Sequence, residues 1–513
     1  MPRTPTLTFD RGTLLLHPPP RGRDWVDFAT WDDRVEKFRI RAIHYRPLLE
    51  CLQAEGQNFT DEAKAYEQLE LVSTGAMQPY PHQEQALSAW QQAGNQGVVV
   101  LPTASGKTYL AQLAMQATCR STLIVVPTLD LMHQWYANLK AAFPKIEIGL
   151  LGGGARDKTP ILVATYDSAT IHAETLGNKY GLLVFDECHH LPTDFYRAIA
   201  EFAIAPFRLG LTATPDRTDG RHSDLHFLIG PTVYSKRPED LAGNALADHK
   251  IVQIMVKLSP EEGDRYNELM KVRNDFLKQN KIKISSLEGW KQFIMASARS
   301  PLGRQAMLAH RQAKEISLCT AGKLRILAEL LEKHYPQRTL IFTADNATVY
   351  RISQDFLIPT ITHQTPVKER HEILDRFRSG EYKTLVASHV LNEGVDVPDA
   401  RIAIVLSGTG SEREYIQRLG RVLRKSSDVN KLAILYEVVT ENTSEERTSQ
   451  RRRGGVKGQK PKLQAIAEPP EPEYQQLEIF QPAPFYGVSH QTTQRAAESP
   501  QKWGENDDRE DRD

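Results

Sequence analysis

The residues of this chain that are best suited to chemistry lie in the segment VVVLPTASGKTYLA, residues 98–111. An apolar run leads into a loop of small residues, and Gly106, Lys107 and Thr108 stand where a helix should begin. Backbone N–H groups at a helix N-terminus bind phosphate, a lysine ammonium reaches the terminal phosphates, and a threonine hydroxyl ligates Mg²⁺. We therefore predict a site for a nucleoside triphosphate and Mg²⁺. Its loop consists of Thr103, Ala104, Ser105, Gly106, Lys107 and Thr108.

Two adjacent carboxylates, Asp186 and Glu187, end the apolar run of GLLVFDECHH. Burying neighbouring charges is costly unless they are paired or bind a metal. We predict that Asp186 holds Mg²⁺ and that Glu187 orients and deprotonates the attacking water. The alternative is a metal site made of Cys188, His189 and His190. Three contiguous residues after a strand cannot all face one ion, which counts against it.

An arginine-rich segment, YIQRLGRVLR, lies far along the chain. On a helix, Gln417, Arg421 and Arg424 fall at steps of three and four and share one face. Phosphoryl transfer needs cations near the γ-phosphate, and arginine supplies them in a rigid geometry. We predict that these residues complete the site from a second lobe. A solvated helix face is the alternative when the segment is considered alone.

The elements that position these residues are short apolar runs separated by helix-like segments. The first series is GVVVLP, TLIVVP, ILVAT, GLLVFDE and FRLGLTAT, and the second is RTLIFTAD, KTLVAS, ARIAIVLS and KLAILYEVV. Continuous apolar strands that alternate with helices indicate parallel sheets covered on both faces. The predicted fold class is therefore α/β, with two lobes in tandem.

A basic helical stretch, residues 265–314, lies between the two series. It holds eleven Lys or Arg against Glu268, Asp275 and Glu288, with the aromatic residues Tyr266, Phe276, Trp290 and Phe293 between them. This pattern suits a surface that binds a nucleic-acid backbone and bases. A solvated helical linker with its aromatic residues in a small core is the alternative.

The predicted domains are residues 1–75, a small α+β domain; 76–245, the first lobe; 246–320, the helical insertion; 321–442, the second lobe; and 443–513, a disordered tail of low hydrophobicity and blocky charge.

Lys plus Arg and Asp plus Glu both number 64, so only local patches can bind a polyanion. Four scattered cysteines, no signal-peptide pattern and no apolar run near the ~20 residues that span a bilayer predict a cytoplasmic protein without membrane contact. We expect a monomer.

The motifs LPTASGKT, DECHH, LTATP, NEGVDVP and QRLGRVLR, in this order and spacing, resemble the core motifs of superfamily 2 helicases over residues 79–440. Within that superfamily the chain is similar to the XPB-type DNA helicases. The segments PYPHQEQAL, LTATPDRTD, LHFLIGPTVY and FTADN carry this likeness, together with the helical insertion. The resemblance implies two RecA-like domains, a thumb-like insertion and an N-terminal damage-recognition domain. Ala104 stands where such loops usually have glycine, and its Cβ narrows the allowed backbone angles.

The resemblance also implies roles for further residues. Gln83 matches the glutamine that reads adenine, and Gly394 and Asp396 match a motif near the ribose. His189, Thr212 and Thr214 match residues that couple the ATP state to closure of the lobes. The residues that match nucleic-acid contacts are Pro127, Thr128, Thr165, Arg217, Asp219 and Ser388. Thr218, between Arg217 and Asp219, replaces the glutamate of the XPB strand-opening element.

The function implied is an ATP-dependent DNA helicase of 3′ to 5′ polarity that acts in DNA repair, on a single strand or a fork. ATP would bridge the lobes and close the cleft between Lys107 and Arg421. A duplex translocase that does not separate strands, an RNA helicase, and an ATP-gated DNA clamp that recruits a nuclease remain open. The resemblance also makes a nuclease a candidate partner.

Overall fold

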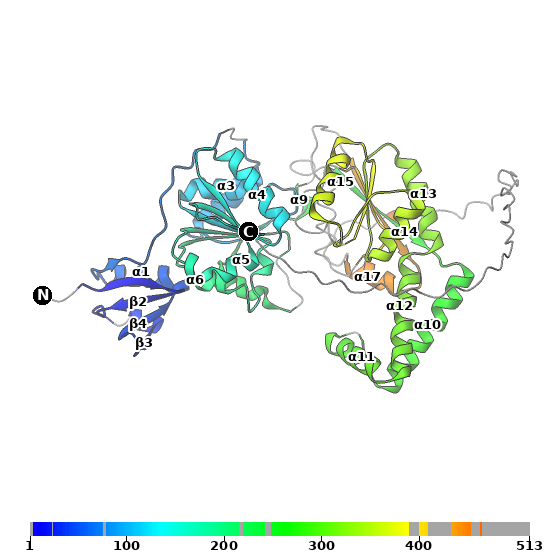
Figure 1. The fold of residues 1–513 in the computed structure, drawn as a ribbon, viewed down its shortest axis with the longest axis horizontal. Coiled ribbons are helices and arrows are strands. Elements are labelled where there is room, and N and C mark those ends of the chain that lie inside the picture. Colours follow the sequence, from blue (N-terminus) through cyan, green and yellow to red (C-terminus); the bar gives the residue numbers. More distant parts are fainter. Residues whose placement is uncertain are drawn as a thin grey trace, which may run out of the picture. The chain divides into compact units, whose positions relative to one another are not determined.

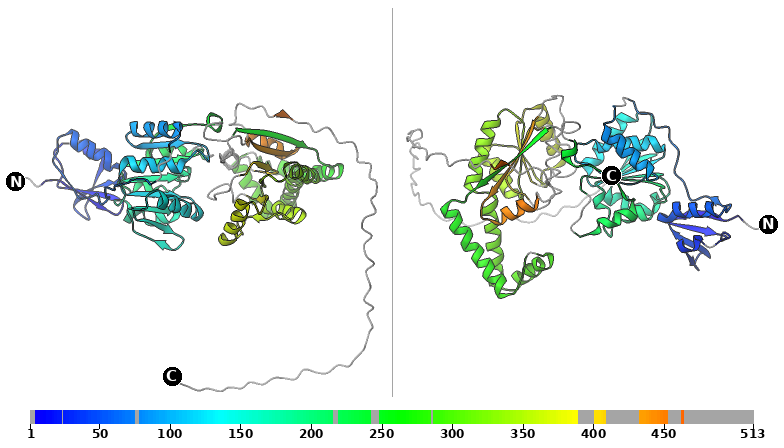
Figure 2. Two further views of the ribbon diagram at one scale, coloured as in Figure 1. Left: turned by 90° about the horizontal axis from the view of Figure 1, so that it is seen from above. Right: turned by 180° about the vertical axis from the view of Figure 1, so that it is seen from behind.

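The computed structural model describes residues 4–22, 24–74, 78–214, 219–241, 248–284, 286–388, 400–408, 432–452 and 462–463. The ribbon is drawn in Figure 1 and in two further views in Figure 2. Among the described residues, none of the helices is both long and apolar enough to cross a lipid bilayer.

The N-terminal domain is a sheet with one helix against it. Its elements are β1 (Thr6–Asp10), β2 (Thr13–His17), the 3-10 helix η1 (Asp24–Phe28), β3 (Ala29–Asp32), β4 (Lys37–Arg41), η2 (Ala42–His44), α1 (Tyr45–Ala54) and β5 (Thr60–Asp61). The strand order is β3-β4-β2-β1-β5. Alternate residues such as Leu14 and Leu16 are buried together with Leu48 and Leu52 of α1. The domain is α+β, as the sequence predicts.

The first lobe is a largely parallel sheet with helices on both faces. Its elements are α2 (Pro81–Gln92), β6 (Gln96–Val100), α3 (Lys107–Thr118), β7 (Thr122–Val126), α4 (Leu129–Ala142), β8 (Ile148–Gly152), β9 (Ala155–Arg156), β10 (Ile161–Thr165), α5 (Tyr166–Ile171), α6 (Ala173–Leu176), β11 (Leu182–Asp186), η3 (Cys188–His190), α7 (Ala198–Glu201), β12 (Phe207–Thr212), η4 (Arg221–Ser223), α8 (Asp224–Leu228), β13 (Thr232–Ser235) and α9 (Pro238–Leu241). The order is β13-β6-β12-β11-β7-β10-β8-β9, and β8 and β9 are antiparallel.

Each inner strand of this lobe is buried on both faces. In β7, Ile124 and Val126 belong to one core, whereas Leu123 and Val125 belong to the other. Helices α3 and α4 cover one face and α5 and α6 the other (Figure 1). Burial on both sides explains why these strands are continuous apolar runs instead of alternating apolar and polar residues.

The second lobe repeats this architecture. Its elements are β14 (Asp248–Val256), α13 (Ala321–His334), β15 (Thr339–Phe342), α14 (Asn346–Phe356), β16 (Thr360–Ile361), α15 (Val367–Ser379), β17 (Thr384–Ala387), β18 (Ile402–Val405), β19 (Leu432–Thr440), α17 (Ser444–Arg452) and β20 (Lys462–Leu463). The order is β16-β17-β15-β18-β19-β14-β20, and each pair of neighbouring strands in it is parallel. The predicted fold class, two parallel-sheet domains in tandem, is confirmed.

Two elements fall outside the domain limits that the sequence suggests. Strand β14 precedes the helical insertion, yet it pairs with β19 over residues 248–256, so the sheet of the second lobe begins before the insertion and not at residue 321. Helix α17 lies in the stretch expected to be a disordered tail. It packs through Glu445, whose Oε2 lies 2.6 Å from Nζ of Lys323 in α13. The lobe therefore extends at least to this helix.

The insertion consists of α10 (Pro260–Gln279), α11 (Leu287–Arg299) and α12 (Pro301–Leu318). Helices α10 and α12 lie side by side, and α11 lies at the end where the chain connects them (Figures 1 and 2). Tyr266, Phe276 and Phe293 are buried in two small cores between these helices. The aromatic residues therefore hold the helices together, and the interpretation that they lie ready to stack on bases is wrong for these three.

Candidate functional site

Three neighbouring parallel strands bring the predicted catalytic residues of the first lobe, Lys107, Asp186 and Glu187, to one sheet edge. Strand β12 lies between β6 and β11, with Thr212 opposite Val100 and Asp186 opposite Leu211. Because the strands are parallel, their carboxyl ends meet at the same edge of the sheet, where ligands of such sheets bind. The loop after β6, the end of β12 and the carboxylates after β11 therefore form one site.

The loop after β6 turns sharply into α3 at Gly106. This glycine has φ 82°, in the left-handed region, and it precedes the first helical residue, Lys107. A Cβ at position 106 would collide with Nε2 of Gln83. The backbone angle therefore favours glycine here, and any larger residue would also have to displace the end of the Gln83 side chain. The first N–H groups of α3 have no intrahelical acceptor, so they are available to phosphate oxygens.

Ala104 has φ 66° although it carries a Cβ. A non-glycine residue in the left-handed region costs roughly 1–2 kcal/mol. The sequence predicts that the Cβ of Ala104 restricts the backbone at this position. In the structure this residue is strained, and it lies in the phosphate-binding loop. Strain of this kind persists where the surrounding structure imposes it and collects at ligand sites.

Polar contacts fix the rest of the loop. Oγ of Ser105 donates to the carbonyl of Pro102 at 2.7 Å, and Nζ of Lys107 donates to the carbonyl of Leu101 at 3.2 Å. Lys107 and Thr108 are only partly buried. The ammonium group is thus held at the mouth of the loop, within reach of solvent.

The first turn of α2 braces the same loop. Nε2 of Gln83 donates to the carbonyls of Ser105 and Gly106, both at 3.2 Å, and a ring nitrogen of His82 lies 2.9 Å from the Ser105 carbonyl. Oε1 of Gln83 accepts from the backbone N–H of Tyr80 at 2.9 Å. Gln83 therefore contacts the phosphate-binding loop directly. A pocket of about 410 Å³ lies beside it, lined by Tyr80, Pro81, His82, Gln85, Lys236, Asp240 and Leu241.

The carboxylate of Asp186 is buried and bonded on both oxygens. Oδ2 accepts from Nε1 of Trp135 at 2.8 Å, and Oδ1 accepts from the backbone N–H of Glu187 at 3.0 Å. Burial, followed by the charge of Glu187, raises the pKa of Asp186 to about 6, while Lys107 opposes the shift. Such an environment favours a bound cation, which would offset the cost of the buried charge.

Glu187 is in the left-handed region, with φ 48°, and leads into η3. Its Oε2 lies 3.4 Å from both Nδ1 of His189 and Oγ1 of Thr212. Nδ1 of His189 lies 3.1 Å from Oγ1 of Thr212, which also accepts from the backbone N–H of Thr214 at 3.2 Å. The structure therefore brings together all three residues that the sequence suggests for coupling: His189 and Thr212 contact the predicted general base, and Thr214 contacts Thr212.

The alternative metal site at Cys188, His189 and His190 is not formed. Cys188 is buried in the apolar core on one face of the sheet, where burial raises the pKa of its thiol well above the ordinary value. No cluster of His, Cys, Asp or Glu suited to a metal ion occurs within the described ranges.

Comparisons with known proteins agree with this geometry. Family models match the chain as "Xeroderma pigmentosum group B helicase damage recognition domain" over residues 7–63, "Type III restriction enzyme, res subunit" over 76–217, and "Helicase conserved C-terminal domain" over 322–426. The "DNA 3'-5' translocase XPB2" of Sulfurisphaera tokodaii is 44% identical over 372 residues, which cover 72% of this chain and 84% of that protein. The chain belongs to the XPB-type superfamily 2 helicases.

Other XPB-type relatives are more distant. Proteins named "DNA 3'-5' helicase XPB" from Kineococcus radiotolerans and Mycobacterium tuberculosis are both 31% identical. The matches cover 71% and 68% of this chain but only 60% and 59% of those proteins. Family membership confirms the predicted enzyme class, an ATP-dependent helicase.

The residues of this XPB-type helicase fit Mg²⁺ and a triphosphate. The buried carboxylate of Asp186 already accepts one N–H on each oxygen, which leaves further lone pairs free for a cation. The hydroxyl of Thr108 is in the first turn of α3, next to Lys107. A hard carboxylate and a hydroxyl are the donors that Mg²⁺ accepts in phosphoryl-transfer sites.

Residues predicted to contact nucleic acid begin helices in the first lobe. Thr128 caps α4, where its side chain accepts from the N–H of Leu131 at 3.3 Å, and Thr165 caps α5 by accepting from Ser168 at 3.3 Å. Pro127 precedes the first of these caps. In the second lobe, Ser388 follows β17 and is buried. Asp219 is exposed and accepts from the N–H of Arg221 at 3.2 Å.

Several predicted site residues of the XPB-type chain lie outside the described residues. They are Arg217, Gly394, Asp396, Gln417, Arg421 and Arg424. The predicted arginine contribution from the second lobe therefore stays a prediction.

Two aromatic residues at the site are not among the site residues that the sequence predicts. Trp135, in α4, donates to the side chain of Asp186, and the hydroxyl of Tyr166, the first residue of α5, donates to the Asp186 backbone carbonyl at 3.1 Å. The sequence contains only a weak signal for these two residues. Trp135 and Tyr166 follow the predicted contacts Thr128 and Thr165 closely in sequence, but nothing in the sequence identifies Asp186 as their partner.

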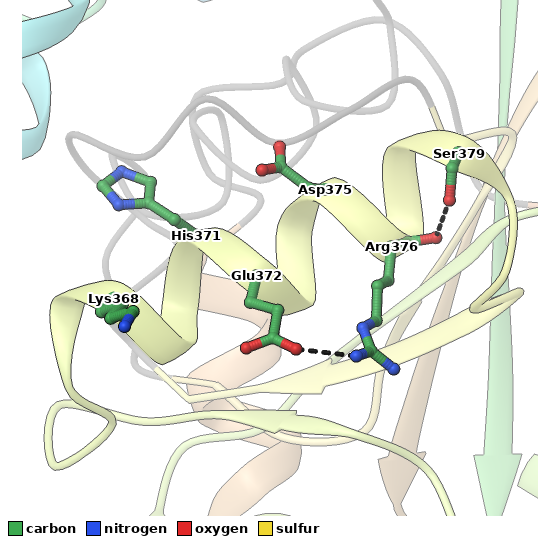
Figure 3. Close-up of a pocket in the computed structure, with 6 residues that line it drawn as sticks. All are labelled: Lys368, His371, Glu372, Asp375, Arg376 and Ser379. Atoms are coloured by element: carbon green, nitrogen blue, oxygen red, sulfur yellow. Dashed lines mark hydrogen bonds and ion pairs between the residues drawn. The ribbon is translucent and has the colours of Figure 1, made fainter.

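A hollow of about 560 Å³ lies along α15 (Figure 3). It is lined by Lys368, His371, Glu372, Asp375, Arg376 and Ser379, all from one helix. Nη2 of Arg376 donates to Oε1 of Glu372 at 2.7 Å. Its basic and acidic groups are mixed and partly paired with each other, so the hollow lacks the net charge that would favour a charged ligand.

Proposed function

We propose that this chain is an ATP-driven DNA motor that moves 3′ to 5′, separates strands and acts in DNA repair. The observation that carries the proposal is the meeting of the Lys107 loop, the two carboxylates and the His189–Thr212 pair at one sheet edge. The XPB-type relatives are named as acting on DNA in the 3′ to 5′ direction, and the match over residues 7–63 is to a damage recognition domain. Both support DNA as the substrate.

The chemistry follows from the placement of the side chains. The N-terminus of α3 and the ammonium of Lys107 bind the phosphates of ATP, with Asp186 and Thr108 holding Mg²⁺. When bound, Mg²⁺ neutralises charge on the phosphate oxygens. Glu187, kept in place by Thr212 and His189, accepts the proton of the attacking water. We assign Gln417, Arg421 and Arg424 to the opposite side of the triphosphate.

Base and ribose contacts are part of the same proposal. We propose that Gln83 and the pocket beside it accept the adenine, and that Gly394 and Asp396 contact the ribose. Binding of ATP closes the lobes on each other, and the change reaches Thr214 through the hydroxyl of Thr212. The strand lies along Pro127, Thr128, Thr165, Arg217, Asp219 and Ser388. Contacts to phosphates carry little base information, so the affinity for DNA should fall with salt and depend weakly on sequence.

A duplex translocase that leaves the strands paired is the second candidate. The specific observation in its favour is the name of the relative that is 44% identical, a DNA 3′-5′ translocase. Two assays separate the candidates. Displacement of a labelled strand from a 3′-tailed fork, with none from a 5′-tailed fork, supports the helicase. Displacement of the third strand of a triplex without any unwinding supports the translocase.

The proposal is tested by ATP hydrolysis measured with single-stranded DNA, duplex, fork and RNA at one salt concentration. DNA should stimulate the wild type, and Lys107→Ala should lower the stimulated rate by about 100-fold or more because a phosphate-binding cation is lost. Lys145→Ala, an exposed lysine of the same lobe, is the matched control and should keep the wild-type rate. A wild-type rate of ATP hydrolysis that does not change when DNA is added, or a Lys107→Ala chain that still unwinds DNA, contradicts the proposal that the chain is a motor.

A further inference from the structure

Asp186 has two aromatic donors from two different helices. Trp135 of α4 donates to Oδ2 at 2.8 Å, and Tyr166 of α5 donates to the backbone carbonyl at 3.1 Å. Trp135 is 1% exposed and Tyr166 is 2% exposed. The two bonds hold the side chain and the backbone of one residue from both helix layers of the lobe.

A structural role alone does not account for the choice of partner. A buried indole N–H or phenol needs an acceptor, and backbone carbonyls supply one elsewhere in this lobe. Nε1 of Trp90 donates to the carbonyl of Arg208 at 2.9 Å, and the hydroxyl of Tyr180 donates to the carbonyl of Thr159 at 3.2 Å. Trp135 instead donates its N–H to the Asp186 carboxylate, which we assign to Mg²⁺.

The bond from Trp135 restricts how the carboxylate can turn. Glu187 N–H occupies Oδ1 and Trp135 occupies Oδ2, so rotation of the Asp186 side chain would break one bond or both. A carboxylate that is fixed in advance binds a cation without first losing rotational freedom. Groups that hydrogen-bond to metal ligands in this way typically affect metal affinity or activity by about 10–100-fold.

Helix α4 connects Trp135, which donates this bond, to the partly exposed start of the helix. The helix begins at Leu129, directly after its cap Thr128, which is partly exposed. Trp135 lies seven residues from Thr128, or about 10 Å along the helix axis. In the proposed function Thr128 contacts the strand, so a strand seated there acts on the same rigid rod that carries Trp135.

The geometry points to Trp135 and Tyr166 as positioning residues that set Asp186 for Mg²⁺, with Trp135 passing the arrival of DNA at the start of α4 to that carboxylate. This inference rests on the proposed function, because it needs DNA at α4 and Mg²⁺ at Asp186. Neither side chain touches the substrate. Both act through Asp186, and the loss of either should weaken the response to Mg²⁺ and to DNA together.

The test uses the full chain with Tyr166→Phe, which removes only the hydroxyl donor, and Trp135→Phe, which removes the N–H donor and also part of the buried ring. Trp90→Phe and Tyr180→Phe are the matched controls, since each removes a buried donor of the same kind from a backbone carbonyl of the same lobe. Two quantities are measured: the Mg²⁺ concentration that half-saturates ATP hydrolysis, with and without single-stranded DNA, and the gain in affinity for a fluorescent ADP analogue when Mg²⁺ is added.

For Trp135→Phe we expect the half-saturating Mg²⁺ concentration to rise by about 10-fold or more, with a smaller stimulation by DNA and a smaller Mg²⁺-dependent gain in ADP binding. Tyr166→Phe should shift the same quantities in the same direction. The control variants should match the wild type in all of them. If a Trp135→Phe chain melts too low to assay, Tyr166→Phe alone decides.

The inference is overturned if Trp135→Phe and Tyr166→Phe respond to Mg²⁺ and DNA like the control variants. It is also overturned if all four variants lose activity alike, since the effect would then be loss of a buried hydrogen bond anywhere in the lobe. A wild-type chain that DNA does not stimulate refutes the proposed function instead, and the Mg²⁺-dependent ADP binding still reports on Trp135 in that case.

Discussion

Nδ1 of His189 lies 3.1 Å from Oγ1 of Thr212, a residue that ends the neighbouring strand. Both groups are fully buried and both reach Oε2 of Glu187. The general base of the proposed reaction is therefore held by one group from η3, which follows β11, and one from the end of β12, so a shift between these two elements changes its position.

Thr212→Val should lower DNA-stimulated ATP hydrolysis by about 10-fold or more, because Glu187 loses the hydroxyl that positions it. Strand displacement per ATP hydrolysed should fall further, since Thr214 loses its link as well. Thr122→Val is the control, as the buried Thr122 hydroxyl donates only to the nearby carbonyl of Arg120, at 2.9 Å. Equal coupling ratios in Thr212→Val and wild type would contradict a coupling role for this hydroxyl.

The phosphate-binding loop offers two opposite substitutions. Gly106→Ala should weaken nucleotide binding, since it strains φ 82° and pushes the end of the Gln83 side chain out of its place against the loop. Ala104→Gly should leave the free energy of unfolding unchanged or raise it by about 1 kcal/mol, because relief of left-handed strain exceeds the added chain entropy. Nucleotide titration and thermal melting measure both. A marked loss of stability in Ala104→Gly would show that residue 104 is not strained.

The buried ion pair of Lys323 and Glu445 should be essential to the second lobe. Both side chains are 1% exposed, so Glu445→Ala leaves an unpaired buried ammonium and should cost about 3–5 kcal/mol in the free energy of unfolding. Replacing both partners, as Lys323→Met with Glu445→Leu, should recover most of the loss. Glu268→Ala, which breaks the exposed pair with Arg265, is the control and should cost about 1 kcal/mol or less. Chemical denaturation measures the free energy of unfolding of each variant. A Glu445→Ala variant that loses no more stability than Glu268→Ala would contradict the importance of the buried pair.

Acid should loosen the helical insertion through His310. Burial, followed by the charges of Arg273 and Lys314, lowers the pKa of His310 to about 4, below the ordinary value of 6.5. The folded state therefore keeps the imidazole neutral, and its stabilising contribution is complete above pH 6.5 and is lost as the pH falls towards 4. Hydrogen exchange of α11 and α12, corrected for the intrinsic rate, should show this loss.

In His310→Gln the same pH range should have little effect on protection of the insertion. His310 packs against Trp290, with ring centroids 5.3 Å apart, so some stability is lost at every pH. A variant whose protection falls with acid as steeply as in the wild type would exclude His310 as the cause.

The elements that sequence patterns predict are those whose signal is local. The strand, loop and helix around Lys107 form one continuous segment, and the apolar runs that became β7, β11 and β15 are buried on both faces as their composition requires. These features need no knowledge of distant partners.

The features that sequence patterns miss depend on long-range pairing. Strand β14 joins the second sheet through β19, which follows only after the whole insertion and most of the lobe. Helix α17 has the polar sequence SEERTSQRR, and it is fixed by one buried carboxylate that finds Lys323. The partnership of Trp135 with Asp186 joins residues 51 positions apart. Composition and periodicity contain none of these pairings.

The central claim is that residues from both lobes act on one ATP, and the most direct measurement is DNA-stimulated ATP hydrolysis by Arg421→Ala beside Lys107→Ala. We predict that both variants lose about 100-fold or more of the stimulated rate while remaining folded, because each removes a cation that the phosphates need. An Arg421→Ala chain that hydrolyses ATP at the wild-type rate with DNA present would show that the second lobe takes no part in the reaction.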